Sequence, residues 1–533
     1  MDKLLNKIAV VTVTDYRDYP RYFWEEILRE KCEEFLWFDL EKEYFNNGKK
    51  KTQEKLLNFL EKEKPDYVFM FDSLFYDLDL LSIFTKMKEI SPKTKTVCFA
   101  GDDDFTFDAS RYLALFFDYY LVAQNDFIPL YEKDGLSNSF FITQITPCNI
   151  NKNAKKIYDV SFIGAPKSDR KEIIEYLMNR GIDISLFGAP GWNKHHEIKN
   201  IYKGPLSSED LPITVDKTKI NICLSTNMAG VPHMKGRFLE YLECKAFSLV
   251  EYSPQMAELF KENKEVVFFR GKEDLVKKIK YYLKNPKERE KIIDAGYKKL
   301  KSKFDFRKEL DKFIKKTKNE SKRDSLPKLD ATIINLDEGS MRLSKKDLLE
   351  KIGNDEYISF SKGDVLKSKF KDYLQIYSLI KNNKDISCCD YFISSKSMGD
   401  IGRFRYCPFG KLDGAKYNIF LDINQVVVSR KYFIKNFNVL KKSYITNEVR
   451  FINNDNTAFV SVPLLKIIKF RKGFFNNPEF LNDLGLFLFS FHRELYSRRK
   501  RPLKMFIYSF FLFKEIFFGK TFIFKYLIKN LRR

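Results

Sequence analysis

Short apolar runs alternate with amphipathic stretches along the first 315 residues of the chain. Runs such as KIAVVTV (7–13) and FLWFDL (35–40) have the length and composition of buried strands, and a helix is expected between them over YFWEEILREKCEEF (22–35). The alternation resumes at Tyr158 with DVSFIG, DISLFG, KINICL, FSLVEY and EVVFF. Apolar strands that alternate with helices are typical of parallel sheets covered on both faces. We therefore predict an α/β fold with two such blocks.

Acidic side chains follow the expected strands of the first block. Asp72 and the run Asp102, Asp103 and Asp104 fall where strands are expected to end. Ligands of parallel sheets bind beyond the carboxyl ends of the strands, so these aspartates are candidates to contact a substrate. The alternative is that they only cap helices and turns, where aspartate is common.

A turn in the second block carries two cations before a short helix. Lys235, Gly236 and Arg237 precede or begin FLEYLECKA, and Glu240 lies on its first turn. Cations at the start of a helix suit a diphosphate, and a carboxylate suits ribose hydroxyls, so this turn predicts a nucleotide site. The alternative is that both cations lie on a solvated edge and Glu240 is a surface residue.

Further loops of the second block supply candidates for the same ligand. Gly164 permits a close approach of the backbone, and Lys167 or Ser168 at the next helix start suits a phosphate. The loop around Gly188 and Trp192 is expected to line the base or the sugar. The polar loop after KINICL adds two further candidates, Thr226 and Asn227. For Gly164 to Ser168, the alternative is an ordinary strand-to-helix turn.

The segment KGRFLEYLECKAFSLVEYSPQMAELF resembles the nucleotide-sugar segment of the CgeB-like (spore maturation protein) glycosyltransferases, and the resemblance extends over about residues 1–315. The chain departs from the family pattern at Leu239, where the family has Phe, and at Glu243-Cys244-Lys245, where the family has a small, Gly-containing turn. The resemblance implies a GT-B fold of two facing Rossmann-like domains, with the acceptor on 1–150 and the nucleotide sugar on 151–314. In GT-B folds the last helix often crosses back to the first domain.

The same resemblance implies an activity. A sugar would pass from a nucleoside-diphosphate sugar, UDP- or GDP-linked, to a cell-surface glycan, lipid-linked or protein acceptor, with no metal or other cofactor. Lys235 and Arg237 would neutralise the leaving group and Glu240 would hold the ribose. If the reaction inverts the anomeric centre, Asp102, Asp103 and Asp104 are the candidate bases. The alternatives are a polymer phosphoryl-type transferase on the same fold and a non-catalytic scaffold that organises partner transferases at a membrane.

Residues 315–328 are polar and without periodicity, so we expect a linker. The segment 330–465 weakly resembles a GT-A, family 2-like glycosyltransferase. Of the acidic run that holds a metal in such enzymes, SKGD (361–364) keeps only Asp364. We therefore expect 329–478 to be a degenerate GT-A-like α/β domain without catalysis, used for binding or assembly.

The net charge of +23 calls for an acidic partner or surface, and it is concentrated in the last segment. Within the helical tail expected over 479–533, residues 497–533 hold eleven Lys or Arg, one Glu and many aromatics. We predict that 497–533 binds an anionic membrane surface; the alternative is that its aromatics pack onto the preceding domain.

Other features of the sequence limit the expected partners, metal sites and location of the protein. The chain has no recognition helix, zinc finger or RNP motif, so nucleic acid is not an expected partner. Its four His make a zinc site improbable, and its eight Cys have no paired spacing, which indicates reduced thiols in the cytoplasm. The N-terminus reads directly into a strand, so no signal peptide is expected, and no apolar run is long enough to span a bilayer. We expect peripheral attachment to the inner face of the cytoplasmic membrane.

Overall fold

The computed structural model divides the chain into two compact units: Met1–Pro327 form most of the first, and the second begins at Lys328. The structure describes residues 3–12, 25–71, 80–101, 103–143, 154–166, 169–188, 191–207, 210–226, 234–320, 326–363, 365–367, 370–395, 399–404, 423–446 and 456–468. The predicted tail and Asp364 lie outside these ranges.

The first block of alternating elements folds as a parallel sheet, as the pattern predicts, and its strand order is β2-β1-β3-β4-β5-β6. The strands are β1 (Leu5–Thr12), β2 (Cys32–Asp39), β3 (Tyr67–Phe71), β4 (Lys95–Ala100), β5 (Tyr119–Val122) and β6 (Ser139–Phe141). The helices are α2 (Leu40–Glu63), α3 (Leu80–Ile90), α4 (Asp103–Leu113), η2 (Asn125–Phe127) and α5 (Ile128–Lys133). The prediction of a helix over 22–35 is wrong at its C-terminal end, because β2 begins at Cys32, whose side chain is buried.

The second block forms another parallel sheet, in the order β11-β10-β9-β7-β8. Its strands are β7 (Tyr158–Ile163), β8 (Ile184–Phe187), β9 (Thr218–Cys223), β10 (Ser248–Glu251) and β11 (Val267–Phe269). Its helices are α6 (Arg170–Asn179), η3 (Trp192–Lys194), α7 (Asp210–Asp216), α8 (Gly236–Glu243), α9 (Pro254–Leu259), α10 (Lys272–Lys284) and α11 (Pro286–Lys303). The two parallel sheets confirm the predicted pair of Rossmann-like α/β blocks.

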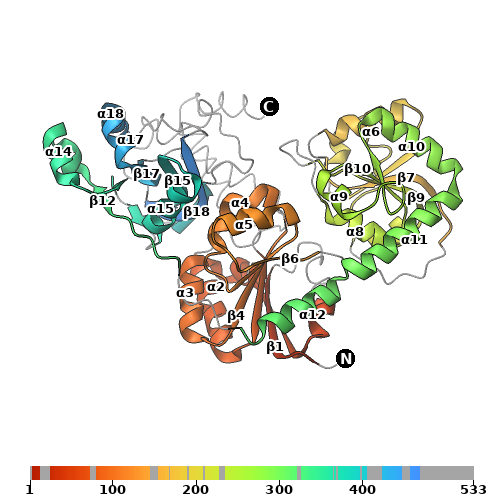
Figure 1. Cartoon of the computed structure of the whole chain (residues 1–533), viewed down its shortest axis with the longest axis horizontal. Helices are drawn as coiled ribbons and strands as arrows, with labels where there is room; N and C mark the ends of the chain where they lie inside the picture. Colours follow the sequence, from red (N-terminus) through yellow and green to blue (C-terminus); the bar gives the residue numbers. More distant parts are fainter. Residues whose placement is uncertain are drawn as a thin grey trace, which may run out of the picture. The chain divides into compact units, whose positions relative to one another are not determined.

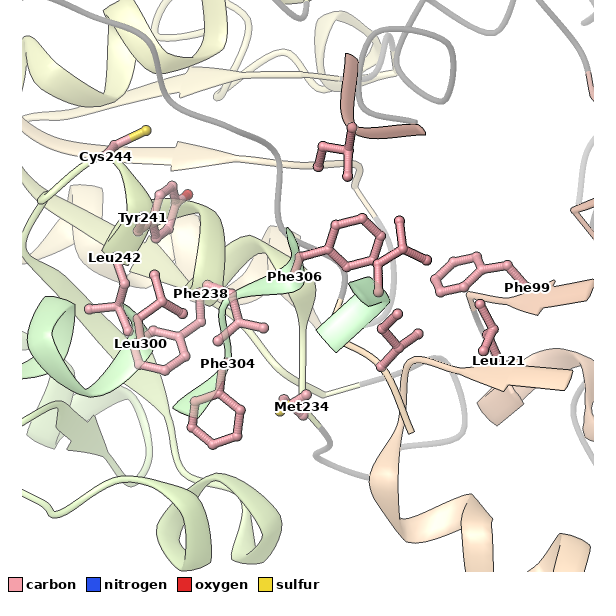
Figure 2. Close-up of a cluster of buried hydrophobic side chains, with 14 of the residues drawn as sticks. Phe99, Leu121, Met234, Phe238, Tyr241, Leu242, Cys244, Leu300, Phe304 and Phe306 are labelled. Atoms are coloured by element: carbon pink, nitrogen blue, oxygen red, sulfur yellow. The ribbon is translucent and has the colours of Figure 1, made fainter. Parts of the chain in front are cut away.

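A further helix, α12 (Phe306–Thr317), crosses back onto the first sheet (Figure 1). The hydroxyls of Tyr67 and Thr317 are 2.8 Å apart, and Lys31, which is buried, pairs with Asp311 at 2.8 Å. One hydrophobic cluster continues from Phe99 and Leu121 of the first sheet to side chains of α8, α11 and α12 (Figure 2). Helix α12 runs to Thr317, so residues 315–317 of the expected linker are helical.

The second unit contains a mixed seven-stranded sheet in the order β12-β13-β17-β15-β18-β14, with β16 paired to β15. Its strands are β12 (Ile333–Leu336), β13 (Tyr357–Phe360), β14 (Val365–Lys367), β15 (Ile386–Ser395), β16 (Gly399–Phe404), β17 (Val426–Ser429) and β18 (Thr457–Ile468). Its helices are α13 (Glu338–Arg342), α14 (Lys345–Ile352), α15 (Lys371–Asn382), η5 (Ile423–Gln425), α17 (Arg430–Lys435) and α18 (Phe437–Thr446). In the described part of the chain, every helix is too short or too polar to span a membrane.

Candidate nucleotide site

The candidate site lies at the carboxyl edge of the second sheet. Because the strands are parallel, the segments that follow β7, β9 and β10 leave the sheet at the same edge. Two helices begin there: α6 at Arg170, after β7, and α8 at Gly236, after β9. The topology therefore brings residues about 70 positions apart in the sequence to one place.

Three cations converge on the end of β9. Cys223, its last residue, is buried, and burial raises the pKa of its thiol to about 12, while the charges of Arg237, Arg170 and Lys235 act in the opposite direction. Only nearby charges affect a buried thiol in this way. The starts of α6 and α8 therefore bring Arg170, Lys235 and Arg237 within electrostatic range of Cys223 at the carboxyl edge of the sheet, on the same side as a polyanionic ligand would bind.

Arg170 is the member of this group that the sequence pattern did not identify. Its Nη1 donates to Ala165 O (3.1 Å), and its guanidinium lies 5.6 Å from the ring centroid of Phe162. Burial lowers the pKa of Arg170, and its Nε has no hydrogen-bond partner among the described residues. A buried guanidinium nitrogen without an acceptor is costly, so an anionic ligand that supplies one would be favoured. The position of Arg170 on the first turn of a helix that follows a glycine turn is the sequence feature that could have indicated a phosphate contact.

Helix α8 is held in place because residues 238–242 are all buried. Phe238, Tyr241 and Leu242 are buried in the hydrophobic cluster together with Leu300 and Phe304 (Figure 2). Because α8 follows a parallel strand, its amino end lies at the carboxyl edge of the sheet, and its role in binding phosphate stays a prediction.

The predicted motif around the start of α8 contains an ion pair within the helix. Arg237 Nη1 lies 2.6 Å from Glu240 Oε2, and the side chain of Glu240 is buried while that of Arg237 is 29% exposed. Lys235 is the N-cap residue of α8, but its side chain makes no capping hydrogen bond. The alternative of Glu240 as a surface residue is therefore wrong. Its contact with ribose stays a prediction, and such a contact would share the carboxylate with Arg237.

The two predicted glycines are neighbours in space. Gly188 has φ +109, and a Cβ built on it would lie 2.8 Å from both N and O of Gly164. Only glycine fits this backbone contact. Trp192 supports the contact from inside: it is fully buried and its Nε1 donates to Gly164 O (2.9 Å). The expectation that Trp192 lines the base or sugar is corrected accordingly, because no part of its side chain reaches the surface.

The acidic run of the first block is described only in part. Asp103 begins α4, is buried, and accepts a hydrogen bond from Tyr131 Oη (2.7 Å). A carboxylate in this interior position is not placed to take a proton from a substrate, so Asp103 serves the fold. Asp102 and the side chain of Asp104 lie outside the described part of the chain, as do Lys167, Ser168 and Asn227. Thr226 is described, and its hydroxyl donates to Glu251 Oε1 (2.8 Å).

Comparisons with known proteins found one matching family model and several solved structures. A family model described as "Glycosyl transferase-like" matches residues 170–315. Among solved structures, Anabaena HepE in complex with UDP and glucose matches with TM-score 0.44 and 11% identity, covering 58% of this chain and 100% of that one. Thermosynechococcus elongatus sucrose-phosphate synthase matches with TM-score 0.42 and 9% identity, covering 58% and 98%. T4 phage β-glucosyltransferase matches with TM-score 0.39 and 13% identity, covering 59% and 100%. No curated protein sequence matches the chain.

Proposed function

We propose that this protein is a glycosyltransferase that uses a nucleoside-diphosphate sugar, UDP- or GDP-linked, and transfers the sugar to a glycan, lipid-linked or protein acceptor. The observation that carries the proposal is that α6 and α8 begin at the carboxyl edge of the second sheet and bring Arg170, Lys235 and Arg237 near the end of β9. All three residues lie within the segment that matches the glycosyltransferase-like family model.

The chemistry of sugar transfer explains why three cations would gather there. When the bond between the sugar and the diphosphate breaks, negative charge develops on the diphosphate, and fixed cations stabilise that charge in the transition state. Side chains and the amino end of α8 would supply the stabilisation that a divalent metal supplies in other transferases. The proposed reaction therefore needs no metal.

Calorimetric titration with UDP, GDP and their sugar derivatives tests the donor site. Arg170→Ala and Arg237→Ala should each weaken binding about tenfold or more, because a hydrogen bond to a charged group contributes about 1.5–3 kcal/mol. Arg180→Ala is the matched control, since Arg180 is exposed at the far end of α6 and lies over the ring of Tyr176. Unchanged affinity in both site variants would contradict the assignment.

We also propose that the first block holds the acceptor, that 329–478 is a degenerate GT-A-like domain without catalysis, and that 497–533 attaches the protein to the inner face of the cytoplasmic membrane. The support for attachment is the combination of cations and aromatics in the tail, because each cation near an anionic surface adds about 1 kcal/mol. Flotation with anionic vesicles tests it: the full chain should float in a salt-sensitive manner, and a chain ending at residue 496 should float less. Equal flotation of both would refute this role of the tail.

A further inference from the structure

A carboxylate at the end of β10 fixes the first residues of the loop that follows β9. Glu251 Oε2 accepts hydrogen bonds from the backbone N–H groups of Ser225 and Thr226, each at 2.8 Å. Its other oxygen, Oε1, accepts the hydroxyl of Thr226 at 2.8 Å. Ser225 Oγ donates to the backbone oxygen of Glu251 at 2.8 Å. Four contacts between the same two segments hold Ser225 and Thr226 in one conformation.

These bonds decide what the loop can offer a ligand. The two N–H groups that point at Glu251 are already paired, so they are not donors for a phosphate. The single hydroxyl proton of Thr226 is directed to Glu251, which leaves only lone pairs of Thr226 Oγ1 for other partners. A phosphate oxygen has no proton to donate, whereas a sugar hydroxyl or a base N–H has one.

The loop also lies beside the cations. Cys223 is three residues before Thr226, and the charge of Glu251 acts on Arg170 as well as on Cys223. Thr226 Oγ1 therefore lies at the same edge of the sheet as the cations. The cations donate hydrogen bonds to a ligand, whereas this oxygen accepts one.

We infer that Thr226 is a specificity-determining residue that accepts a hydrogen bond from a hydroxyl or N–H group of the nucleotide sugar, and that Glu251 is the positioning residue that fixes the direction of this hydroxyl. The inference rests on the proposed function. It divides the site chemically: Arg170, Lys235 and Arg237 bind the diphosphate, and the Glu251–Thr226 pair recognises a neutral donor group beside it.

Three variants test the inference in the full chain. Thr226→Val keeps the shape of the side chain but removes the acceptor, and Thr226→Ser keeps the hydroxyl. Glu251→Gln replaces one accepting carboxylate oxygen with an NH2 group, which only donates. Thr226→Val and Glu251→Gln should weaken binding of the preferred nucleotide sugar about three- to tenfold, the effect of one neutral hydrogen bond, while Thr226→Ser should bind like wild type. Thermal unfolding of each variant shows whether it is folded.

Inorganic pyrophosphate and the free nucleoside diphosphate separate the possible causes. Pyrophosphate engages only the cations, so Thr226→Val should bind it like wild type. If Thr226→Val weakens the nucleotide sugar but not the free diphosphate, the recognised group is on the sugar; if it weakens both, the group is on the nucleoside. Wild type that binds neither nucleotide nor pyrophosphate would refute the proposed function itself. Wild type that binds while Thr226→Val or Glu251→Gln retains full affinity would overturn only this inference.

Discussion

At the scale of single residues, the ion pair between Arg237 and Glu240 shows how binding and stability are linked in this site. Glu240 is buried, and Arg237 lies 2.6 Å from its carboxylate. A buried carboxylate that loses its partner is destabilised, so the same arginine serves the fold before any ligand arrives. Both residues were predicted from the sequence as ligand contacts. The structure shows that they also contact each other, because they lie three positions apart on one helix.

Replacing Arg237 should therefore affect two measurements. Arg237→Ala should lower the free energy of unfolding by about 1–3 kcal/mol, because Glu240 loses its partner. Arg237→Lys should keep part of that stability while losing affinity for a nucleoside diphosphate, since lysine cannot reproduce the planar geometry of guanidinium. Urea unfolding followed by tryptophan fluorescence, combined with calorimetric titration, measures both quantities. Full stability of Arg237→Ala would show that the pair contributes nothing to the fold.

The backbone contact between Gly188 and Gly164 gives a second prediction at this scale. Gly188→Ala should destabilise the protein by about 1–3 kcal/mol more than Gly204→Ala. Both substitutions strain the backbone, but only the Cβ at position 188 also clashes with Gly164. The control is matched: φ is +109 at Gly188 and +106 at Gly204, yet a Cβ at Gly204 meets nothing within 4 Å. Thermal unfolding of both variants measures the difference. Equal destabilisation would mean that the close contact has no energetic role.

At the scale of elements, α12 ties the two sheets of the first unit together. Arg307 pairs with Glu26 at 2.7 Å, and Glu309 accepts hydrogen bonds from the backbone N–H (2.9 Å) and hydroxyl (2.6 Å) of Thr143, just after β6. The end of the first sheet is thus attached to the helix that follows the second. Helix α12 follows α11 closely, and its contacts with the first sheet join residues more than 160 positions apart, which no local pattern reveals.

The attachment of Glu309 should depend on pH. Burial is the largest influence on this carboxyl group and raises its pKa above the usual 4.5. The folded state then holds the proton more tightly than the unfolded state, so the contribution of Glu309 to the free energy of unfolding falls as pH rises from 4.5 through the raised pKa. Glu309→Gln does not titrate, and its stability relative to wild type should therefore increase from acidic to neutral pH.

Urea unfolding of wild type and Glu309→Gln at several pH values measures this change. Glu290→Gln is the control, because Glu290 is exposed on α11 of the same unit. A difference between Glu309→Gln and wild type that stays constant with pH would show that folding does not raise the pKa of Glu309.

At the scale of the whole molecule, the parts that the sequence predicted best are those with regular hydrophobic patterns. The two parallel sheets follow from apolar strands such as FSLVEY, which are buried on both faces. The site was predicted less completely. Arg170 was missed because only the fold brings it near Cys223, 53 positions away. Trp192 was expected to line the ligand because a buried indole beside a glycine loop looks the same in sequence as an exposed one.

The central claim is that the cations of the second sheet serve sugar transfer from a nucleoside diphosphate. The most direct measurement is the release of UDP or GDP from a panel of nucleotide sugars, since an active transferase slowly hydrolyses its donor without an acceptor. Wild type and Arg180→Ala should release the diphosphate from at least one donor, and EDTA should not change the rate. Arg170→Ala and Arg237→Ala should lose about 90% or more of the rate, as expected for about 1.5–3 kcal/mol of lost stabilisation. Absence of release from every donor, or equal rates in all four proteins, would contradict it.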